Sequence, residues 1–457
     1  MNRIASRSWI VLVFVLVLIA GTVFFLGEFV LNAEDWVFFF SSPHVYNGTK
    51  LEQGVILDRD GTGLLSLEGR DTYAVDPAVR QAMLHWTGDR DGNIATPLLR
   101  QYTRPVMGFD LVNGLYSYGN APGVLELTIS AKVQTTALKA LGDSKGTVAV
   151  YNYKTGEILC AVSTPTFDPD AVPDISSDTT GAFEGVYLNR FTQVTYTPGS
   201  IFKLVTTAAA LETIPDIQTQ SFECEGELEI GGGMVTCEYK HGTQTLAQAL
   251  TNSCNCAFAR IAEQVGGERL QRYAEAFGVT SSVSFDGITT EEGFVEAGQA
   301  GLHQLCWAGI GQHTDLVNPC QFMTFVGAIA NGGIGANPYV VRQVSVGDTV
   351  HYEEDTVMMD RIMSRSTAEA LQEMMRGNVD NKYGAEHFPG LTVCAKSGTA
   401  EKDGDAEANA LFAGFVMEER YPLAFIVVVE DGGYGANTCV PIISQVLDVC
   451  KEVLDGQ

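Results

Sequence analysis

The hydrophobic pattern of the chain begins with one long apolar segment near the N-terminus. Residues 9–26 are all apolar or small, and residues 29–31 extend the run beyond a single glutamate. About 20 consecutive apolar residues in a helix span the hydrocarbon core of a bilayer. The pattern therefore predicts a transmembrane helix over residues 9–31, preceded by a short tail, residues 1–8.

Charged residues on the two sides of this run predict its orientation. Arg3 and Arg7 precede it, and Glu34 and Asp35 follow it, which favours a cytoplasmic N-terminus and an extracellular remainder. A cleaved signal peptide is the alternative, and it would leave the same domain outside but free. We favour a single uncleaved anchor, because the run is long for a signal-peptide core and no clear A-x-A cleavage site follows it.

Residues 32–121 are glycine-rich and polar, with short strand-like pieces. The stretch QGVILDRDGTGLLSL predicts a β-hairpin, because two apolar runs flank a D-G turn. Two D-x-D-G stretches, residues 58–61 and 89–92, resemble calcium loops, but Gly69 and Arg100 stand where a bidentate glutamate is needed. We interpret both as turns in a short pedestal or dimerisation-like domain.

From residue 124 onward the pattern changes to well-marked strands and helices. GVLELTIS predicts a strand, AKVQTTALKALG an amphipathic helix ending at Gly142, and GTVAVYNYKTGEILCAVSTP a hairpin of two apolar strands. A helical pattern then begins at Ser200, and the stretch HGTQTLAQAL leads into another. Further helical patterns cover residues 256–265, 267–278, 316–333 and 364–378. Strand patterns follow at residues 391–400, 408–417 and 421–430, and a terminal helix is expected at about 441–454.

This order of elements predicts the fold class of residues 122–457. We expect an α+β domain in which the two ends of the segment build one five-stranded antiparallel sheet, with helices packed around it. A hydrophobic content of 46% is consistent with a packed core. The net charge of −27, from 28 basic and 55 acidic residues, argues against a nucleic-acid binder, which needs basic patches.

Ten cysteines are unusual in an exported domain. No C-x-x-C pair occurs, and the C-N-C at residues 254–256 is too tight for zinc, so the spacing predicts no metal site. Cys224 and Cys237 flank the glycine-rich stretch EGELEIGGGMVT and could form a disulfide. Cysteines in apolar runs are predicted to be small buried hydrophobes, and many free thiols would suit a reducing or anaerobic habitat; these are Cys160, Cys306 and Cys394, among others.

Three short stretches carry candidate chemistry. They are S-I-F-K at residues 200–203, S-C-N at residues 253–255 and K-S-G-T at residues 396–399. Each stretch alone has an ordinary structural explanation. The first could be a helix cap with a surface lysine, the second a polar turn, and the third a loop.

The combination of the three stretches favours an active site. Ser200 and Lys203 share one face of a helix, because residues three apart are neighbours there. The residues after Lys203 are apolar, so its burial would lower its pKa and let it accept the serine proton. The order of the stretches matches the S-x-x-K, S-x-N and K-[ST]-G set of penicillin-interacting enzymes.

The chain resembles class B penicillin-binding proteins, which are membrane-anchored peptidoglycan transpeptidases, over most of residues 52–450. Besides the three motifs, the stretches QGVILDRDG, LNRFTQVTYTPGSIFK and WAGIGQHTDLVNPCQFMTFVGAIANGG are similar to segments of that family. The resemblance implies the α+β fold that these proteins share with serine β-lactamases. Four residues outside the motifs depart from the family pattern: Gln53, Ser130, His313 and Asn318.

The resemblance also implies a role for each motif residue. Ser200 would attack the penultimate D-alanine of a D-Ala-D-Ala stem peptide, and Lys203 would accept its proton. Ser253 would relay a proton to the leaving amine, Asn255 would orient the peptide, and Lys396 would attract the terminal carboxylate. The hydroxyls of Ser397 and Thr399 would hold that carboxylate, and Gly398 would let the strand backbone approach the acyl group closely. The backbone amides of Ser200 and Thr399 would form the oxyanion hole.

An amine of a second stem peptide would then complete the cross-link, and β-lactams would be trapped as acyl-enzymes. No metal or cofactor is implied, and His241 and His313 are predicted to be structural or rim residues. The family resemblance further suggests that the pedestal docks on a polytopic membrane glycan polymerase. The protein itself would be located in the bacterial cytoplasmic membrane.

Three alternative functions would use much the same site residues but differ in what happens to the acyl-enzyme. A class A β-lactamase adds a glutamate after the S-x-N motif, and no E-x-x-x-N stretch follows here, whereas a class D-like enzyme needs none. A D,D-carboxypeptidase would use water in place of the amine. A non-catalytic β-lactam sensor would acylate without turnover, but a single anchor and the lack of an H-E-x-x-H motif argue against it.

Overall fold

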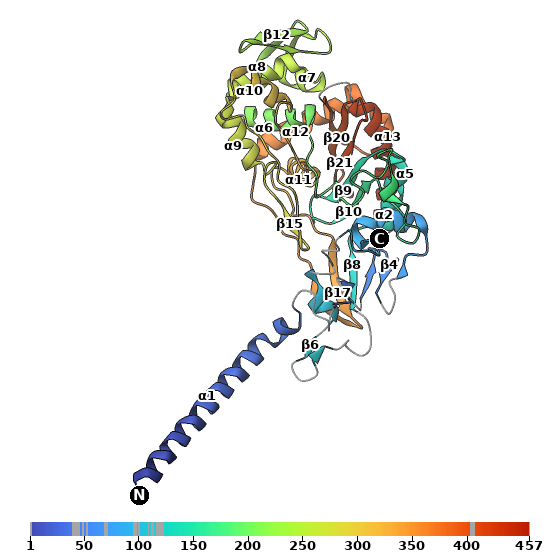
Figure 1. Cartoon of the computed structure of the whole chain (residues 1–457). Helices are drawn as coiled ribbons and strands as arrows, with labels where there is room; N and C mark the ends of the chain where they lie inside the picture. Colours follow the sequence, from blue (N-terminus) through green and yellow to red (C-terminus); the bar gives the residue numbers. More distant parts are fainter. Residues whose placement is uncertain are drawn as a thin grey trace.

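The computed structural model shows an elongated helix and a folded body (Figure 1). It describes residues 2–38, 46–47, 50–51, 54–67, 72–94, 98, 101–107, 109–110, 114–115, 123–402 and 407–456. Helix α1 (Asn2–Val37) runs away from the body, and its apolar side chains are exposed. Within the described residues it is the one helix long and apolar enough to cross a membrane.

The centre of the body is the predicted five-stranded antiparallel sheet, in the order β10-β9-β21-β20-β19. Its strands come from both ends of the domain, so the predicted fold class is confirmed. They are β9 (Gly146–Asn152), β10 (Ile158–Thr164), β19 (Val393–Ala400), β20 (Asn409–Val416) and β21 (Leu423–Val429).

Helices cover both faces of this sheet. Strand residues point alternately to opposite faces, so Val148 and Val150 join one hydrophobic core while Ala149 and Tyr151 join the other. Helices α5 (Ala131–Leu141) and α13 (Gly435–Asp455) pack on the first face, and α11 (Pro319–Ala330) packs on the second. These two layers bury most of the sheet, although Ser397 and Thr399 of β19 stay partly exposed.

Six further helices form a block beside β19. They are α6 (Lys203–Thr213), α7 (Leu246–Thr251), α8 (Asn255–Val265), α9 (Gly267–Ala276), α10 (Leu302–Ile310) and α12 (Arg365–Asn378). The helical patterns in the sequence predicted all of these except α10. The predicted start of the last helix at residue 441 is wrong, because α13 begins at Gly435 and holds Pro441 in its interior. In a sequence, proline is typical of the first turn of a helix, whereas in a helix interior it removes one backbone hydrogen-bond donor.

The pedestal is built around a six-stranded sheet in the order β18-β17-β8-β3-β4-β5. The predicted hairpin is present as β3 (Val55–Leu57) and β4 (Gly63–Ser66), and β5 (Thr72–Tyr73) follows. Strand β8 (Gly123–Leu127) pairs in parallel with β3. The outer strands come from far along the chain, as β17 (Val341–Val346) and β18 (Thr349–Glu353). This sheet therefore joins segments on both sides of the predicted boundary after residue 121.

Asp58 shows why the first D-x-D-G stretch is structural. One carboxylate oxygen accepts hydrogen bonds from the backbone amides of Asp60 (3.0 Å) and Thr62 (2.7 Å), which closes the hairpin turn. The other accepts from the amide of Ala131 (2.9 Å), the first residue of α5. Asp58 thus supplies the helix cap that the side chain of Ser130 does not make. One turn in the pedestal thereby fixes the first helix of the sheet domain.

Candidate active site

Ser200 lies in a 3₁₀ turn that leads directly into helix α6. The turn spans Gly199–Phe202, and Lys203 is the first residue of the α-helix. Gly199 has a φ of +54°, and a Cβ there would lie 2.6 Å from the carbonyl oxygen of Thr399. Glycine is therefore required for this turn to approach strand β19. The arrangement places Lys203 Nζ 2.9 Å from Ser200 Oγ.

The second motif lies between helices α7 and α8. Ser253 has a φ of +53°, Cys254 caps α8 and Asn255 begins it. This bend turns both polar side chains toward Lys203. Nζ of Lys203 lies 2.8 Å from Asn255 Oδ1, 2.7 Å from the carbonyl oxygen of Ser253 and 3.2 Å from Ser253 Oγ. The lysine therefore joins the first two motifs directly.

The third motif reaches the same point from strand β19. Lys396 Nζ lies 3.1 Å from Ser253 Oγ and donates to the carbonyl oxygen of Ser397 at 2.9 Å. A Cβ on Gly398 would lie 2.8 Å from the carbonyl oxygen of Pro198, so only glycine lets the strand pass this close to the Ser200 turn. Five predicted side chains thus meet in one cluster: Ser200, Lys203, Ser253, Asn255 and Lys396.

Burial controls the charge of both lysines. Lys203 and Lys396 have no exposed surface. Loss of hydration holds the pKa of Lys203 well below its usual value, and the nearby charge of Lys396 lowers it further. Burial also lowers the pKa of Lys396, to about 7, with a smaller contribution from Lys382. A neutral amine at Lys203 can accept a proton from the serine that it touches.

Two other predicted residues border the cluster on β19. Ser397 and Thr399 are half-buried. The Thr399 hydroxyl accepts a hydrogen bond from the backbone amide of Gly435 (3.3 Å), at the start of α13. The backbone of Thr399 lies against the turn that carries Ser200. Ser200 and Thr399 therefore lie in neighbouring segments, and an oxyanion hole built from their backbone amides stays a prediction.

Comparison with known proteins identifies the family. A family model described as "Penicillin binding protein transpeptidase domain" matches residues 146–448, which include all five clustered side chains. The chain belongs to the penicillin-binding protein transpeptidase family. The family predicted from the three motifs is thereby confirmed.

Of two relatives of this penicillin-binding protein, one is named for peptidoglycan transpeptidation and the other for sporulation. "Peptidoglycan D,D-transpeptidase PbpA" of Mycolicibacterium smegmatis is 30% identical over 68% of this chain and 68% of its own length. "Stage V sporulation protein D" of Bacillus subtilis is 28% identical over 85% of this chain, which spans 60% of that relative's length.

Solved structures agree with the fold. The crystal structure of the D,D-transpeptidase domain of a peptidoglycan glycosyltransferase from Eggerthella lenta has a TM-score of 0.76 and 26% identity, over 88% of this chain and 98% of that one. The imipenem acyl-enzyme complex of penicillin-binding protein A from M. tuberculosis has a TM-score of 0.74 and 25% identity, over 87% and 98% of the two chains.

Tyr383 is a site residue of this penicillin-binding protein that the sequence did not reveal. Its buried hydroxyl accepts from the backbone amide of Ser397 (3.0 Å) and lies 2.9 Å from Ser397 Oγ and 3.5 Å from Lys396 Nζ. It comes from a π-helical turn (Val379–Tyr383) after α12. No motif surrounds it, so only its place in the fold shows that it supports the K-S-G-T strand.

Asn378, another residue without a motif, links two parts of the site. Its side-chain amide donates to the carbonyl oxygen of Ala395 (2.9 Å), next to Lys396. Its side-chain oxygen accepts from the hydroxyl of Thr251 (2.9 Å), at the end of α7. Asn378 is completely buried, so this bridge holds the strand of the third motif against the helix that precedes the second.

The segment before the nucleophile is held by one buried ion pair. Arg190 Nε lies 2.8 Å from Glu430 Oε1, and the hydroxyl of Tyr196 donates to the same oxygen at 2.9 Å. Glu430 directly follows strand β21. The family-like stretch LNRFTQVTYTPGSIFK is therefore fastened to the central sheet, which sets the position of Ser200.

The structure also explains two of the departures from the family pattern. Asn318 caps α11 by accepting from the amide of Cys320 (3.0 Å), and it donates to the carbonyl oxygens of Thr192 (3.1 Å) and Val194 (2.9 Å). His313 has a φ of +68°, in the region that favours glycine, which is the usual family residue there. Gln53 lies outside the described residues.

The cysteines correct one prediction and confirm another. Cys224 and Cys237 do not form the predicted disulfide, because all ten cysteines are free thiols. Cys237 Sγ instead lies 3.6 Å from Cys254 Sγ. The cysteines predicted to be small buried hydrophobes are indeed buried: Cys160, Cys306 and Cys394.

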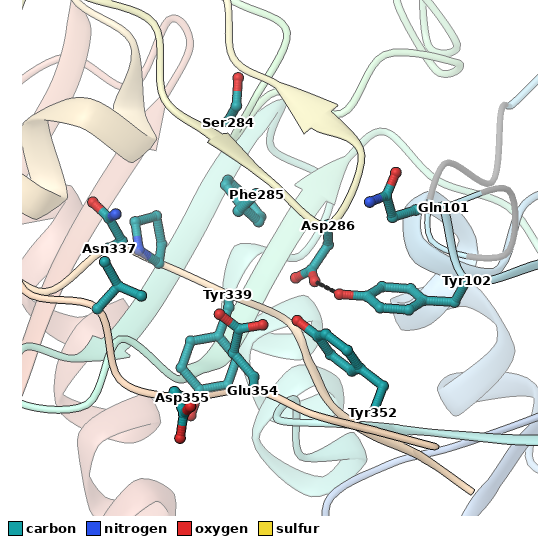
Figure 2. Close-up of a pocket in the computed structure, with 12 residues that line it drawn as sticks. Gln101, Tyr102, Ser284, Phe285, Asp286, Asn337, Tyr339, Tyr352, Glu354 and Asp355 are labelled. Carbon is teal, nitrogen blue, oxygen red and sulfur yellow. Dashed lines mark hydrogen bonds between the residues drawn. The ribbon is translucent and has the colours of Figure 1, made fainter. Parts of the chain in front are cut away.

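A separate cavity of about 180 Å³ lies where the pedestal meets the sheet domain (Figure 2). Asp286 lies at its centre, where its carboxylate accepts from the hydroxyl of Tyr102 (2.5 Å) and from the backbone amide of Val340 (2.6 Å). Burial raises the pKa of this carboxyl above its usual value. Because none of the motif residues lines this cavity, we assign Asp286 to the joint between the two parts rather than to catalysis.

Proposed function

We propose that this penicillin-binding protein is a peptidoglycan D,D-transpeptidase that works through an acyl-enzyme on Ser200. The contact between Lys203 Nζ and Ser200 Oγ carries the proposal. A serine hydroxyl is a weak nucleophile until a neighbouring base removes its proton. Burial lowers the pKa of Lys203 and so favours the neutral amine that can act as this base.

In the first half-reaction Ser200 Oγ bonds to the carbonyl carbon of the penultimate D-alanine, and its proton moves to Lys203 Nζ. Backbone amides of Ser200 and Thr399 would stabilise the oxyanion. The peptide C–N bond then breaks, and a proton reaches the leaving D-alanine amine from Lys203 through Ser253 Oγ. The 3.2 Å and 3.1 Å contacts of Ser253 with the two lysines support this relay.

Binding of the donor peptide falls to the remaining motif residues. Asn255 would orient the peptide amide, and Lys396 with the hydroxyls of Ser397 and Thr399 would hold the terminal carboxylate. In the second half-reaction an amine of a neighbouring stem peptide attacks the acyl carbon and loses a proton to Lys203. The ester C–O bond then breaks, and the proton passes from Lys203 to Ser200 Oγ. A β-lactam would acylate Ser200 in the same way and deacylate slowly.

The membrane setting extends this proposal. Helix α1 would anchor the protein in the bacterial cytoplasmic membrane as a single span, with the N-terminus inside and the folded body outside. The pedestal lies at the end of the body nearest α1. This position near the membrane helix supports our proposal that its partner is a polytopic membrane glycan polymerase.

Time-resolved labelling of the full chain in detergent with a fluorescent penicillin tests the proposal. A covalent band that persists in the unaltered protein and is lost in Ser200→Ala supports a penicillin-binding transpeptidase. A band that fades while the drug is hydrolysed would instead indicate a β-lactamase. Incubation with a stem-peptide donor and an amine acceptor then separates cross-linking from hydrolysis by a D,D-carboxypeptidase.

A further inference from the structure

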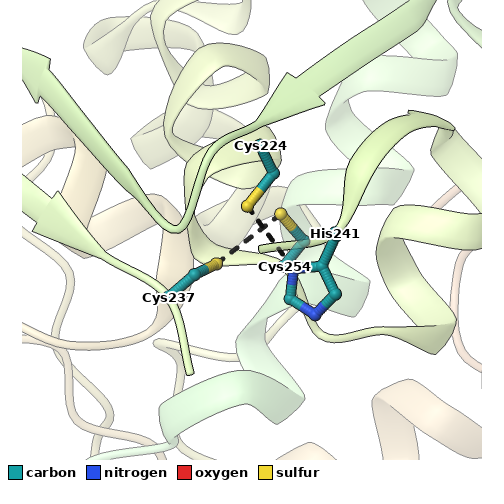
Figure 3. A group of neighbouring side chains, drawn as sticks. All are labelled: Cys224, Cys237, His241 and Cys254. Atoms are coloured by element: carbon teal, nitrogen blue, oxygen red, sulfur yellow. Dashed lines mark hydrogen bonds between the residues drawn. The ribbon is translucent and has the colours of Figure 1, made fainter. Parts of the chain in front are cut away.

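Four potential metal ligands converge next to the S-x-N motif (Figure 3). The sulfur atoms of Cys224, Cys237 and Cys254 and a ring nitrogen of His241 all lie within 4.8 Å of one another. Cys237 Sγ is 3.6 Å from Cys254 Sγ, and Cys224 Sγ is 3.4 Å from His241 Nδ1. Ligand atoms of a tetrahedral zinc site with Zn–S bonds of about 2.3 Å lie roughly 3.8 Å apart. The two closest distances given above, 3.4 Å and 3.6 Å, are near that spacing.

The ligands come from four separate segments. Cys224 ends strand β11 (Ser221–Cys224), Cys237 follows β13 (Gly233–Thr236), and His241 precedes β14 (Gly242–Thr245). Cys254 is the middle residue of the S-x-N motif and the cap of α8. Two of the sulfur ligands, Cys224 and Cys254, are completely buried. A metal ion here would tie the two hairpins of this region to the catalytic bend.

Hydrogen bonds from the start of α8 favour thiolate ligands. The backbone amides of Asn255 (3.0 Å) and Cys256 (3.5 Å) donate to Cys237 Sγ, and the amide of Ala257 (3.4 Å) donates to Cys254 Sγ. The positive end of a helix stabilises negative charge. Metal-bound ligands in proteins are commonly oriented by such outer hydrogen bonds. The helix therefore supplies an outer shell for two of the three sulfurs.

We propose that Cys224, Cys237, His241 and Cys254 form a tetrahedral metal site, best suited to Zn²⁺, that holds the S-x-N segment in its catalytic position. Three sulfurs and one imidazole are a closed ligand set of the structural kind, with no position left for water. The ion would act on catalysis only through geometry. Asn255, whose side-chain amide also donates to the carbonyl oxygen of Thr236 (2.8 Å), lies between two ligands and would be fixed from both sides.

Metal analysis of the full chain, purified in detergent without chelator, tests the site. We expect about one zinc per chain, and a cobalt-substituted form with the strong visible bands of tetrahedral cobalt thiolate. Cys237→Ala and His241→Ala should lose the metal, whereas Cys306→Ala, a buried cysteine outside the site, should keep it. Melting curves of each variant show whether a loss of metal accompanies loss of the fold.

Two results would overturn the metal site. One is a metal-free protein in which mass spectrometry of unreduced peptides finds a Cys237–Cys254 disulfide. The other is a zinc content that does not change in Cys237→Ala and His241→Ala, which would mark the ion as adventitious. The cobalt spectrum of the unaltered chain gives an answer even if both variants fail to fold.

The positioning role rests on the proposed function and has its own readout. Removal of zinc by a chelator should slow acylation of Ser200 by fluorescent penicillin roughly tenfold, in line with other outer-sphere effects, and added zinc should restore it. Unchanged acylation after complete zinc loss would overturn the positioning role. No acylation with zinc bound would instead count against the proposed function and leave the metal site standing.

Discussion

Lys396 Nζ lies 3.1 Å from the hydroxyl of Ser253, although 143 residues separate the two along the chain. Lys203 reaches the same hydroxyl from the other side. A serine held between two buried lysines can pass a proton without moving. The following expectations test this arrangement and the packing that supports it.

Replacement of Lys203 by methionine should remove the base and keep the helix packing. We expect the acylation rate of Ser200 to fall by at least about 10²-fold, the usual contribution of a general base. Lys203→Arg should fail similarly, because a guanidinium stays protonated. Stopped-flow labelling with a fluorescent β-lactam measures both. Lys132→Met, on the exposed surface, is the control, and a fast Lys203→Met enzyme would exclude Lys203 as the base.

The two lysines should give acylation a bell-shaped pH profile. Lys203 must be neutral, so the rate should fall as the pH drops through its lowered pKa. Lys396 must be charged to attract a carboxylate, so the rate should also fall as the pH rises above about 7. Removing the positive charge of Lys382 in Lys382→Met should raise the pKa of Lys396 and move the alkaline limb upward.

Rate constants for acylation measured across the pH range, with Lys154→Met as a matched surface control, test this expectation. An alkaline limb that stays in place in Lys382→Met would show that Lys396 does not set it.

Tyr383→Phe should weaken the strand that carries the third motif. The change removes the hydroxyl that pairs with the amide and side chain of Ser397. Leaving buried polar groups unpaired costs about 1–3 kcal/mol, so we expect a lower melting temperature and a higher KM for the donor peptide. Tyr421→Phe, which loses a partly buried contact with Asp455, is the control. Equal effects in both variants would contradict a special role for Tyr383.

Glu430→Gln should loosen the segment before the nucleophile. Breaking a buried ion pair costs about 3 kcal/mol, and the Arg190 side chain is only 6% exposed. Denaturant unfolding in detergent measures the loss. Arg365→Ala, which breaks an exposed pair with Glu369, should cost no more than about 0.5 kcal/mol. Similar losses in the two variants would show that the Arg190 pair contributes nothing beyond a surface contact.

Thiol counting should find ten free cysteines. We expect ten reactive thiols per chain in denaturant with chelator and no reductant, because all ten are free in the structure. In the native protein far fewer should react, since nine of them are buried. A count of eight or less in denaturant would reveal at least one disulfide and contradict the free-thiol state.

The central part of the fold followed from the sequence because its signals are local. Strands β9 and β10 are apolar runs on either side of a clear turn, and helix α12 begins after a capping serine, Ser364. The late strands are continuous apolar runs, which suits a sheet buried on both faces. The pedestal was harder, because strands β17 and β18 come from residues 341–353 and join its sheet through the pairing of β17 with β8, which is distant in sequence.

The candidate site likewise contains some residues that the sequence could reveal and others that it could not. The five clustered side chains could be named beforehand because each belongs to a short motif whose order along the chain is informative. Tyr383 and Asn378 belong to no motif, and their function depends on which strand they happen to meet. The cysteine cluster was missed for a similar reason, since its ligands lie on separate hairpins and one of them hides inside the S-x-N motif.

What the sequence alone determined is therefore the family, the sheet and the candidate site residues, since side-chain chemistry and local periodicity are written into neighbouring positions. The tertiary structure decided the lowered pKa values of the two lysines, because only burial removes the water that stabilises the charged forms of Lys203 and Lys396. It also decided which residues meet at Ser253 and at the cysteine cluster. Such meetings arise from the packing of distant segments, and no pattern along the chain records them.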